Sequence, residues 1–412
     1  MTQSKSLLSP ILLVGCVFLL ISFGVRASYG VFQIPIATDF GWPRTEFSLA
    51  IAIQNLAWGI GQPIFAAFAE RFGDRRALIV GVLVYALGLL LTSLSVTPFA
   101  HQAVSVLVGF GIAGTGFGVV LGVVGRTASD ENRSLALGIA TAAGSAGQVV
   151  GPPLAEALLS VMTWPAVFVV FTVMILALLL AVPAVRTARP AARAPGEESM
   201  AQILGGAFRD PSFGLIFIGF FSCGYQLGFI TAHFPAFITE ACGPIDPAGA
   251  LASLGISSTS ALGASAIALI GLTNIVGTIA AGWLGKSYSK KYLLSSIYLG
   301  RTLVAAAFIM TPMTPATVIL FSLLMGALWL ATVPLTSGLI AQIYGLRYMG
   351  TLYGIVFFSH QLGSFLGVWL GGALYDLTGT YDLVWWIGVG VGALSALVHL
   401  PVVERPRTAA LA

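Results

Sequence analysis

Charged residues are scarce in this sequence, and that scarcity limits the environments in which it can fold. Of its 412 residues, 8% are Asp, Glu, Lys or Arg and 57% are hydrophobic, whereas soluble domains carry about 25% charged residues. So few charges cannot cover a surface that faces water. We therefore expect a protein embedded in a lipid bilayer, with no nucleic acid as a partner.

Cysteine is rare as well. The three cysteines, Cys16, Cys223 and Cys242, are far apart and show neither a disulfide framework nor the spacing of metal ligands. The sequence also has no nucleotide-binding loop, no nucleophile beside a base and no sizeable soluble segment. We expect no enzyme activity, no metal and no cofactor. A membrane-embedded enzyme or a receptor is the least supported class.

Long apolar stretches make up most of the chain, and a helix needs about 20 such residues to cross a bilayer. The sequence predicts an all-α membrane protein with twelve spans. Because the first apolar run continues past Arg26 to Pro35, we expect a retained helix and no cleaved signal peptide. The predicted spans cover residues 9–34, 46–69, 77–97, 102–124, 134–159, 164–184, 212–239, 260–284, 292–312, 315–340, 350–374 and 382–402.

Lys and Arg fall almost entirely on one side of these spans. Arg44 lies alone on the opposite side, and Arg26 and Arg301 lie inside spans. Because basic loops stay in the cytoplasm, we expect both termini to be cytoplasmic and the protein to be a multi-pass inner (plasma) membrane protein. The residues on the basic side are Lys5, Arg71, Arg75, Arg76, Arg126, Arg133, Arg186, Arg189, Arg193, Arg209, Lys286, Lys290, Lys291, Arg347, Arg405 and Arg407.

The two halves of the sequence repeat each other. Ser22, Gly24 and Pro35 recur 200 residues later as Ser222, Gly224 and Pro235. The basic loop at residues 71–76 recurs at 286–291, and the glycines of the fifth span recur in the eleventh. Such a parallel duplication places a substrate site at the midplane between two halves. We expect an N-terminal six-helix bundle over 1–184, a cytoplasmic linker over 185–211 and a C-terminal six-helix bundle over 212–412.

The loop after the second span reads Glu70-Arg71-Phe72-Gly73-Asp74-Arg75-Arg76 and resembles the signature loop of the major facilitator superfamily. The resemblance implies that superfamily's fold and alternating access, with helices one, four, seven and ten lining the cavity. We expect Glu70, Arg71, Asp74, Arg75 and Arg76 to control the conformation. The resemblance names no substrate, since the fold carries many.

Two further segments are similar to carriers of small organic anions. The fifth span, Arg133 to Ala142, resembles the signature of monocarboxylate transporters, and Leu352-Tyr353-Gly354 before His360 is similar to the oxalate/formate antiporter family. The sequence departs from the better-known monocarboxylate transporters in the eighth helix. Asn274 and Thr278 stand there in place of the usual Asp and Arg.

Ionisable residues inside membrane spans are costly and mark functional sites. Arg26 shares a helix face with Ser22, Tyr29 and Gln33, and a guanidinium matches a carboxylate in two-point contact. The alternative is an arginine held by backbone carbonyls for structural reasons. We predict a substrate site composed of Arg26, Tyr29, Gln33, Asn55, Trp58, Gln226, His233, Asn274 and His360.

Three residues are candidates for proton coupling: His360, His233 and Glu156. A histidine with an ordinary pKa near 6.5 can carry a proton in the physiological range, although His360 can equally be a packing residue and Glu156 can face the headgroups. Arg301 lies in a peripheral ninth helix, where either a structural or a functional role fits.

The leading hypothesis is a proton-coupled secondary transporter of a small organic anion, most simply a monocarboxylate, acting as a monomer. It rests on a cationic interior with no Asp or Glu in the central part of any cavity helix. The alternative is a proton-coupled drug or metabolite exporter. Its support is Gly138, Gly147 and Gly151-Pro152 in the fifth span, which resemble the antiporter signature of superfamily exporters up to Ala155-Glu156.

Overall fold

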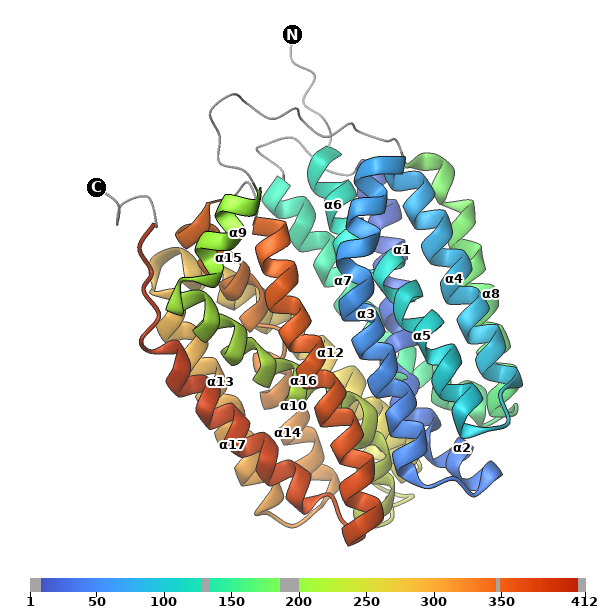
Figure 1. The fold of residues 1–412 in the computed structure, drawn as a ribbon. Helices are drawn as coiled ribbons and strands as arrows, with labels where there is room; N and C mark the ends of the chain where they lie inside the picture. Colours follow the sequence, from blue (N-terminus) through green and yellow to red (C-terminus); the bar gives the residue numbers. More distant parts are fainter. Residues whose placement is uncertain (1–8, 128–132, 186–199, 346–348, 407–412) are drawn as a thin grey trace.

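A computed structural model describes residues 9–127, 133–185, 200–345 and 349–406, and its regular elements are all helical (Figure 1). Helices up to residue 185 form one group, which we call the N-half. Its elements are α1 (Pro10–Ala27), η1 (Tyr29–Phe32), α2 (Gln33–Phe40), α3 (Arg44–Phe72), α4 (Asp74–Leu94), α5 (Pro98–Thr115), α6 (Phe117–Thr127), α7 (Arg133–Leu159), α8 (Trp164–Ala177), η2 (Leu178–Leu180) and η3 (Val182–Ala184).

Helices after residue 200 form the second group, the C-half. They pack around a hydrophobic core of their own, separate from the core that joins α1 to α8. Its elements are α9 (Met200–Phe208), α10 (Pro211–Ala241), α11 (Ala250–Ser253), α12 (Thr259–Ser287), α13 (Lys290–Ile309), α14 (Pro315–Leu328), α15 (Thr332–Tyr344), α16 (Met349–Thr378) and α17 (Asp382–His399).

Several helix starts follow directly from local sequence. Pro10, Pro98, Pro211 and Pro315 each occupy the first turn of a helix, where proline's fixed φ fits and its missing N–H costs nothing. Asp210 caps α10 by accepting a hydrogen bond from the Ser212 N–H at 2.8 Å. The polar and proline-rich connections therefore begin new helices where the apolar runs resume.

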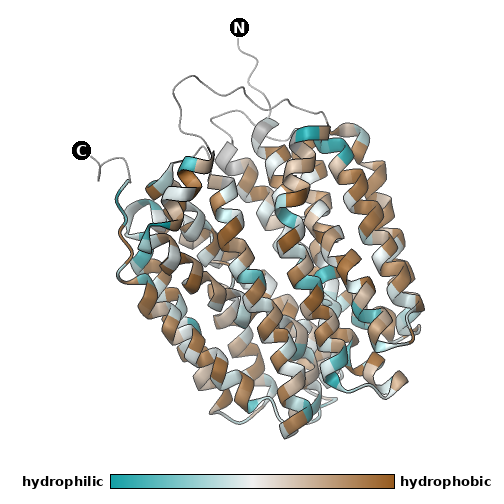
Figure 2. Cartoon of the chain, viewed as in Figure 1, coloured by the Kyte–Doolittle hydropathy of each residue, from teal (hydrophilic) through white to brown (hydrophobic). Residues whose placement is uncertain are grey.

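Eleven helical segments within the described residues are long and apolar enough to cross a membrane. The remaining predicted span, the fifth, coincides with α7, a 27-residue helix that contains Pro152 and Pro153 and does not belong to that group of eleven. Hydrophobic residues make up most of the length of the long helices, and hydrophilic residues occur at several helix ends and at a few positions within the helices (Figure 2). The all-helical membrane architecture is confirmed, and the count of twelve spans stays a prediction.

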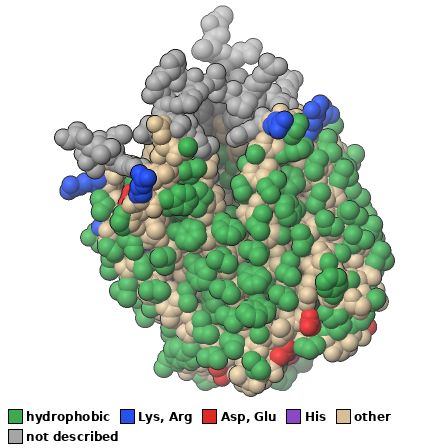
Figure 3. Space-filling model, viewed as in Figure 1, with side chains coloured by type: hydrophobic (Ala, Val, Ile, Leu, Met, Phe, Trp, Pro, Cys, Tyr) green, Lys and Arg blue, Asp and Glu red, His purple; other side chains and the backbone are tan. Residues whose placement is uncertain are grey.

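The described part of the chain begins and ends at the same end of the helix bundle (Figure 1). We call this the terminal end and the opposite one the far end. In the face shown by Figure 3, Lys and Arg side chains gather at the terminal end, and most of the Asp and Glu side chains lie toward the far end. Six basic residues of the predicted cytoplasmic set lie outside the described residues: Lys5, Arg186, Arg189, Arg193, Arg347 and Arg407.

The two halves meet mainly along α3 and α16 and along α7 and α12. Near the middle of α3, the Gly59 backbone lies so close to Gln361 of α16 that an added Cβ would be 2.8 Å from the Gln361 Cβ. Ser145 of α7 accepts a hydrogen bond from the Asn274 amide of α12 at 3.0 Å. These contacts place the interface between the halves directly beside the polar residues of α1 and α3.

Candidate anion site between the two halves

Arg26 lies where the first membrane-spanning segment changes its helical geometry. It belongs to the last turn of α1, which ends at Ala27, and the chain continues as the short 3-10 helix η1. Ser28 closes α1 by donating its hydroxyl to the Gly24 carbonyl at 2.8 Å. The carbonyl end of a helix carries partial negative charge, so this position tolerates a cation. The side chain of Arg26 is half-buried.

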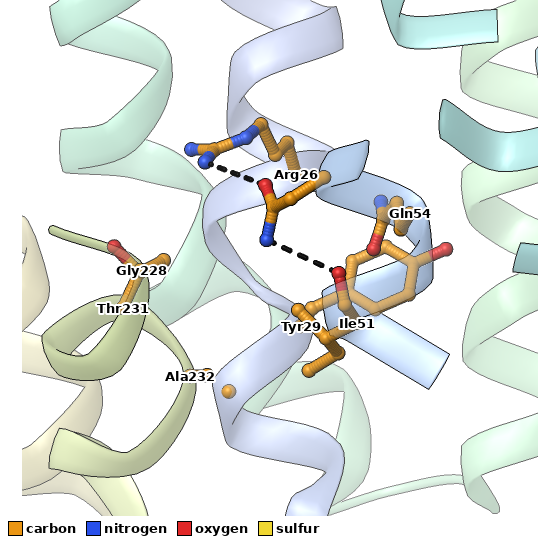
Figure 4. A pocket seen from close by; sticks show the side chains of 9 residues that line it. Arg26, Tyr29, Ile51, Gln54, Gly228, Thr231 and Ala232 are labelled. Atoms are coloured by element: carbon orange, nitrogen blue, oxygen red, sulfur yellow. Dashed lines mark hydrogen bonds between the residues drawn. The ribbon is translucent and has the colours of Figure 1, made fainter. Parts of the chain in front are cut away.

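Two residues of α3 hold the Arg26 guanidinium. Asn55 Oδ1 accepts a hydrogen bond from Arg26 Nη2 at 3.3 Å, and the Asn55 amide donates to the Ile51 carbonyl at 3.1 Å, which fixes its orientation (Figure 4). The ring of Trp58 lies 4.7 Å from the Arg26 guanidinium carbon, a distance suited to a cation–π contact. Trp58 is itself oriented by donating from its indole nitrogen to Gln62 Oε1 at 3.1 Å.

Arg26 has no carboxylate within ion-pair distance among the described residues, where the ion pair recorded is Arg44 with Glu240. Its partners are a neutral amide and an aromatic face, neither of which neutralises its charge. A cation in a low-dielectric interior interacts strongly with any anion that reaches it. The geometry therefore leaves the guanidinium available to an anionic ligand.

A narrow cavity, with space for about one water molecule, opens beside Arg26 (Figure 4). Two of its lining residues, Tyr29 and Gln54, carry a buried polar atom without a hydrogen-bond partner among the described residues, Tyr29 Oη and Gln54 Nε2. The Tyr29 hydroxyl points away from Arg26 (Figure 4), so the Gln54 amide is the donor that could serve an anion here. The lining comes from both halves: Arg26, Tyr29, Gly30, Ile51, Gln54 and Asn55 from the N-half, and Gly228, Thr231 and Ala232 from the C-half.

An aromatic path leads from this site to His360. Trp58 meets Phe357 of α16 edge to face, with ring centroids 5.1 Å apart, and Phe357 stacks on His360 at 5.5 Å. His360 is buried, and its Nδ1 has no partner within the described part of the chain. His360 thus approaches Arg26 through two rings and does not contact it directly.

Gln33 and His233 face each other across the two halves. Gln33 Nε2 lies 3.0 Å from His233 Nδ1, and His233 Nε2 lies 2.8 Å from the Val368 carbonyl oxygen. A carbonyl only accepts, so Nε2 carries hydrogen and Nδ1 of the neutral ring accepts from Gln33. This pair lies beyond the Arg26 cavity toward the far end.

The remaining predicted residues form hydrogen bonds with partners other than Arg26. Gln226 donates to the Gly388 carbonyl of α17 at 3.0 Å. The Asn274 amide group donates to the Ser145 hydroxyl, and its Oδ1 accepts from the Leu330 N–H at 2.9 Å. Leu330 lies at the break between α14 and α15. Glu156 accepts from the Ser260 hydroxyl at 2.5 Å, again between the halves.

The predicted conformational loop forms the tight connection between α3 and α4 at the terminal end. Gly73 has φ +95, a conformation that L side chains rarely adopt, which explains its place in the motif. The Arg71 guanidinium lies 5.2 Å from the Phe72 ring, Asp74 is buried, and Arg75 and Arg76 are exposed. The side chain of Glu70 lies outside the described residues.

Arg301 is enclosed within the C-half. Its side chain is 0% exposed, and Nη2 donates to the Trp329 carbonyl at the break between α14 and α15. Nε and Nη1 have no partner among the described residues. Arg301 therefore supports an interrupted helix and does not face the cavity at Arg26.

Sequence reasoning missed several residues of this region. Gln54, Gly228 and Thr231 line the cavity but belong to no charged or aromatic pattern. Arg44, predicted as the lone basic residue on its side of the membrane, forms an ion pair with Glu240 of the C-half, which its isolated charge could have suggested. Within the described residues, no group of three His, Cys, Asp or Glu side chains is arranged to hold a metal ion.

Comparison with known proteins agrees with this architecture. The sequence model of the Major Facilitator Superfamily matches residues 14–368 and 243–412. The chain is 25% identical, over 91% of its length and 90% of the relative's, to the uncharacterized MFS-type transporter YcxA of Bacillus subtilis (strain 168). It is 27% identical to monocarboxylate transporter 13 of Bos taurus, over 92% of this chain and 86% of that protein.

A third similarity covers less of the chain. It is 28% identical to a probable L-galactonate transporter of Escherichia coli (strain K12), over 38% of this chain and 34% of that protein. The superfamily predicted from the loop at Gly73 is thereby confirmed. The chain belongs to the Major Facilitator Superfamily of membrane transporters.

Proposed function

We propose that this transporter carries a small organic anion, with a monocarboxylate as the simplest case, by alternating access between two six-helix halves. The observation that carries the proposal is Arg26, a cation without a carboxylate partner at a cavity lined by both halves. The substrate carboxylate would supply the missing counter-charge. Gln54, a lining residue whose Nε2 has no partner among the described residues, is a further donor for the carboxylate.

Similarity to a monocarboxylate transporter over 92% of the chain supports the same substrate class. The shape of the site also favours a small ligand, because the cavity is narrow and the Trp58 and Phe357 rings meet across the halves beside it. We place the termini in the cytoplasm and the protein, with twelve spans and as a monomer, in the inner membrane. The basic terminal end follows the rule that positive loops stay inside.

Proton coupling is part of the proposal, with His360, His233 and Glu156 as the candidate groups. His360 lies two rings from Arg26, and His233 and Glu156 both bind a residue of the opposite half. A group at the contact between halves can couple its protonation to their separation, since its hydrogen bonds exist in one state only.

An exporter of cationic drugs is the competing function. A cationic substrate requires a buried acid, and the carboxylates that the structure describes at the interface lie toward the far end, at Glu156, Glu240 and Asp376. The glycine pattern of α7, which the alternative rests on, instead provides close packing: Gly147 and Gly151 contact the backbone of α1 within the N-half.

Uptake into proteoliposomes tests the function directly. Purified protein should accumulate a labelled small monocarboxylate, and an inward proton gradient should accelerate uptake in a manner that an uncoupler abolishes. Dicarboxylates and cationic drugs serve as comparison substrates. Transport of cations with no transport of carboxylates would overturn the proposal and favour the exporter.

A further inference from the structure

The first turn of α3 receives its cap from the opposite half of the protein. The first N–H groups of a helix lack partners within it, and Pro43, which precedes α3, makes no side-chain cap. Asp376, in the last turn of α16, accepts from the Arg44 N–H at 3.0 Å and from the Thr45 N–H at 2.7 Å. The Thr45 hydroxyl donates to the same carboxylate at 2.5 Å.

The side chain of Arg44 extends this contact to α10 and to Tyr381, the N-cap residue of α17. It forms an ion pair with Glu240 of α10 and donates from Nη1 to Tyr381 Oη at 2.7 Å. Its guanidinium carbon also lies 3.7 Å from the Tyr375 ring centroid. One arginine from the N-half thus contacts three C-half side chains, while its backbone N–H binds a fourth.

Glycines allow the two halves to approach this closely. A Cβ added at Gly372 of α16 would lie 2.4 Å from Ser48 Oγ and 2.8 Å from the Arg44 carbonyl oxygen. A Cβ at Gly30 of η1 would lie 2.2 Å from the Thr231 carbonyl oxygen of α10. Any larger residue would have to push the halves apart at the far end.

Hydrogen bonds between the two halves are distributed unevenly along the membrane axis. Those formed between described residues lie at the middle or toward the far end: Asn274 with Ser145, Gln33 with His233, Ser260 with Glu156, and the contacts of Arg44 and Thr45. The structure is therefore closed at the far end, and the contacts at Asp376 are ones that a far-end opening must break.

We propose that Asp376 sets the conformational equilibrium of transport by capping α3 from the opposite half. The carboxylate binds two backbone N–H groups only while the far end is closed. When the far end opens, water must replace the Asp376 carboxylate at the N-terminus of α3, a position that favours a negative charge. Asp376 is a positioning residue in this account, since it does not approach the cavity at Arg26. The inference rests on the proposed function only in requiring that the halves move relative to each other.

The test variant is Asp376→Asn. An amide offers one accepting oxygen, and its NH2 group would face an N–H of α3, so the two-point cap is lost while the side-chain volume is kept. The matched control is Glu46→Gln, also in the first turn of α3. Glu46 accepts from Gln102 at 2.6 Å within the N-half, so its loss breaks no contact between halves.

The measurement is the distance between spin labels at the far end, in full-length protein with its native cysteines replaced by alanine. Phe99→Cys and Leu254→Cys place one label in each half, since both residues are highly exposed at that end. Without substrate, Asp376→Asn should increase the far-end-open population about fivefold, as expected for loss of a helix cap. Glu46→Gln should leave the distance distribution unchanged, and Asp376→Glu, which keeps the carboxylate, should restore part of the closed population.

A distance distribution for Asp376→Asn identical to that of the parent protein would overturn the inference, as would an equal shift in Glu46→Gln. Substrate binding is measured separately on the same variants. If no carboxylate binds to any variant but the distances shift as expected, the proposed substrate fails and the role of Asp376 stands. If carboxylate binds but Asp376→Asn leaves the distances unchanged, the role of Asp376 fails and the proposed substrate stands.

Discussion

The two arginines inside the membrane-spanning helices of this transporter, Arg26 and Arg301, both lie at interrupted helices, yet their surroundings differ. Arg26 ends α1 beside a cavity that both halves line, and it is held by an amide oxygen and an aromatic ring. Arg301 is sealed within one half, and it donates to the carbonyl of Trp329 at the break between α14 and α15. The surroundings of an intramembrane charge, more than its depth, thus indicate whether it serves a ligand or the fold.

The strongest expected effect on stability comes from Arg301→Ala. This change leaves the Trp329 carbonyl without its partner and creates a cavity in a packed interior, which together cost about 2–5 kcal/mol. We expect a much lower melting temperature in detergent. The protein that remains folded should bind carboxylate with an affinity close to that of the parent, and a selective loss of binding without loss of stability would assign Arg301 to the site.

A fixed anionic partner for Arg26 should weaken its binding of the substrate. Asn55→Asp places a carboxylate near the guanidinium, in the position of an oxygen now 3.3 Å from Nη2. The new ion pair competes with the substrate, so carboxylate affinity should fall more than tenfold while the melting temperature holds or rises. Asn55→Leu removes the amide without adding charge and should weaken binding less. Equal losses in the two variants would argue against a free cation at this site.

The role of His360 is tested by the pH dependence of transport. If His360 carries the coupled proton, His360→Gln should flatten the uptake profile between about pH 5 and 8, since glutamine does not titrate in this range. A profile identical to that of the parent would remove His360 from coupling. Glu156 and His233, each hydrogen-bonded across the halves, would then be the next variants to measure.

A smaller effect is expected from Trp58→Phe. The change keeps an aromatic face over Arg26 but weakens the cation–π contact and removes the N–H that binds Gln62. We expect carboxylate affinity to fall about twofold to fivefold, by equilibrium binding. Trp283→Phe, a change at an exposed tryptophan of α12, is the control and should have no effect. A loss in Trp58→Phe as large as that of Arg26→Ala would make the ring the principal determinant.

The sequence allowed the membrane class, the superfamily and most helix positions to be predicted, because apolar runs and basic loops are local signals. Arg26, Asn55 and Trp58 were also predicted, and the structure brings them together. The 3-10 turn after Ala27 could not be predicted from an ideal helical face. Gln226 likewise points to α17, which depends on packing between distant helices.

The far-end contacts were beyond sequence reasoning for a related reason. Arg44 and Asp376 are separated by 332 residues, and neither lies in a motif. Their meeting depends on how the two halves are closed against each other, a property of one conformation. Residues whose role exists only in one state of a transporter leave little local pattern in the chain.

The most direct test of the central claim is equilibrium binding of a small monocarboxylate to purified Arg26→Ala and Arg26→Lys, with folding verified by melting temperature. Removing one member of a buried ion pair costs about 2–5 kcal/mol, so the alanine variant should bind more than tenfold more weakly. Lysine should recover only part of the affinity, because an ammonium cannot make the two-point contact of a guanidinium. Binding of carboxylate to Arg26→Ala with the affinity of the parent protein would contradict the account and leave Arg26 a structural residue.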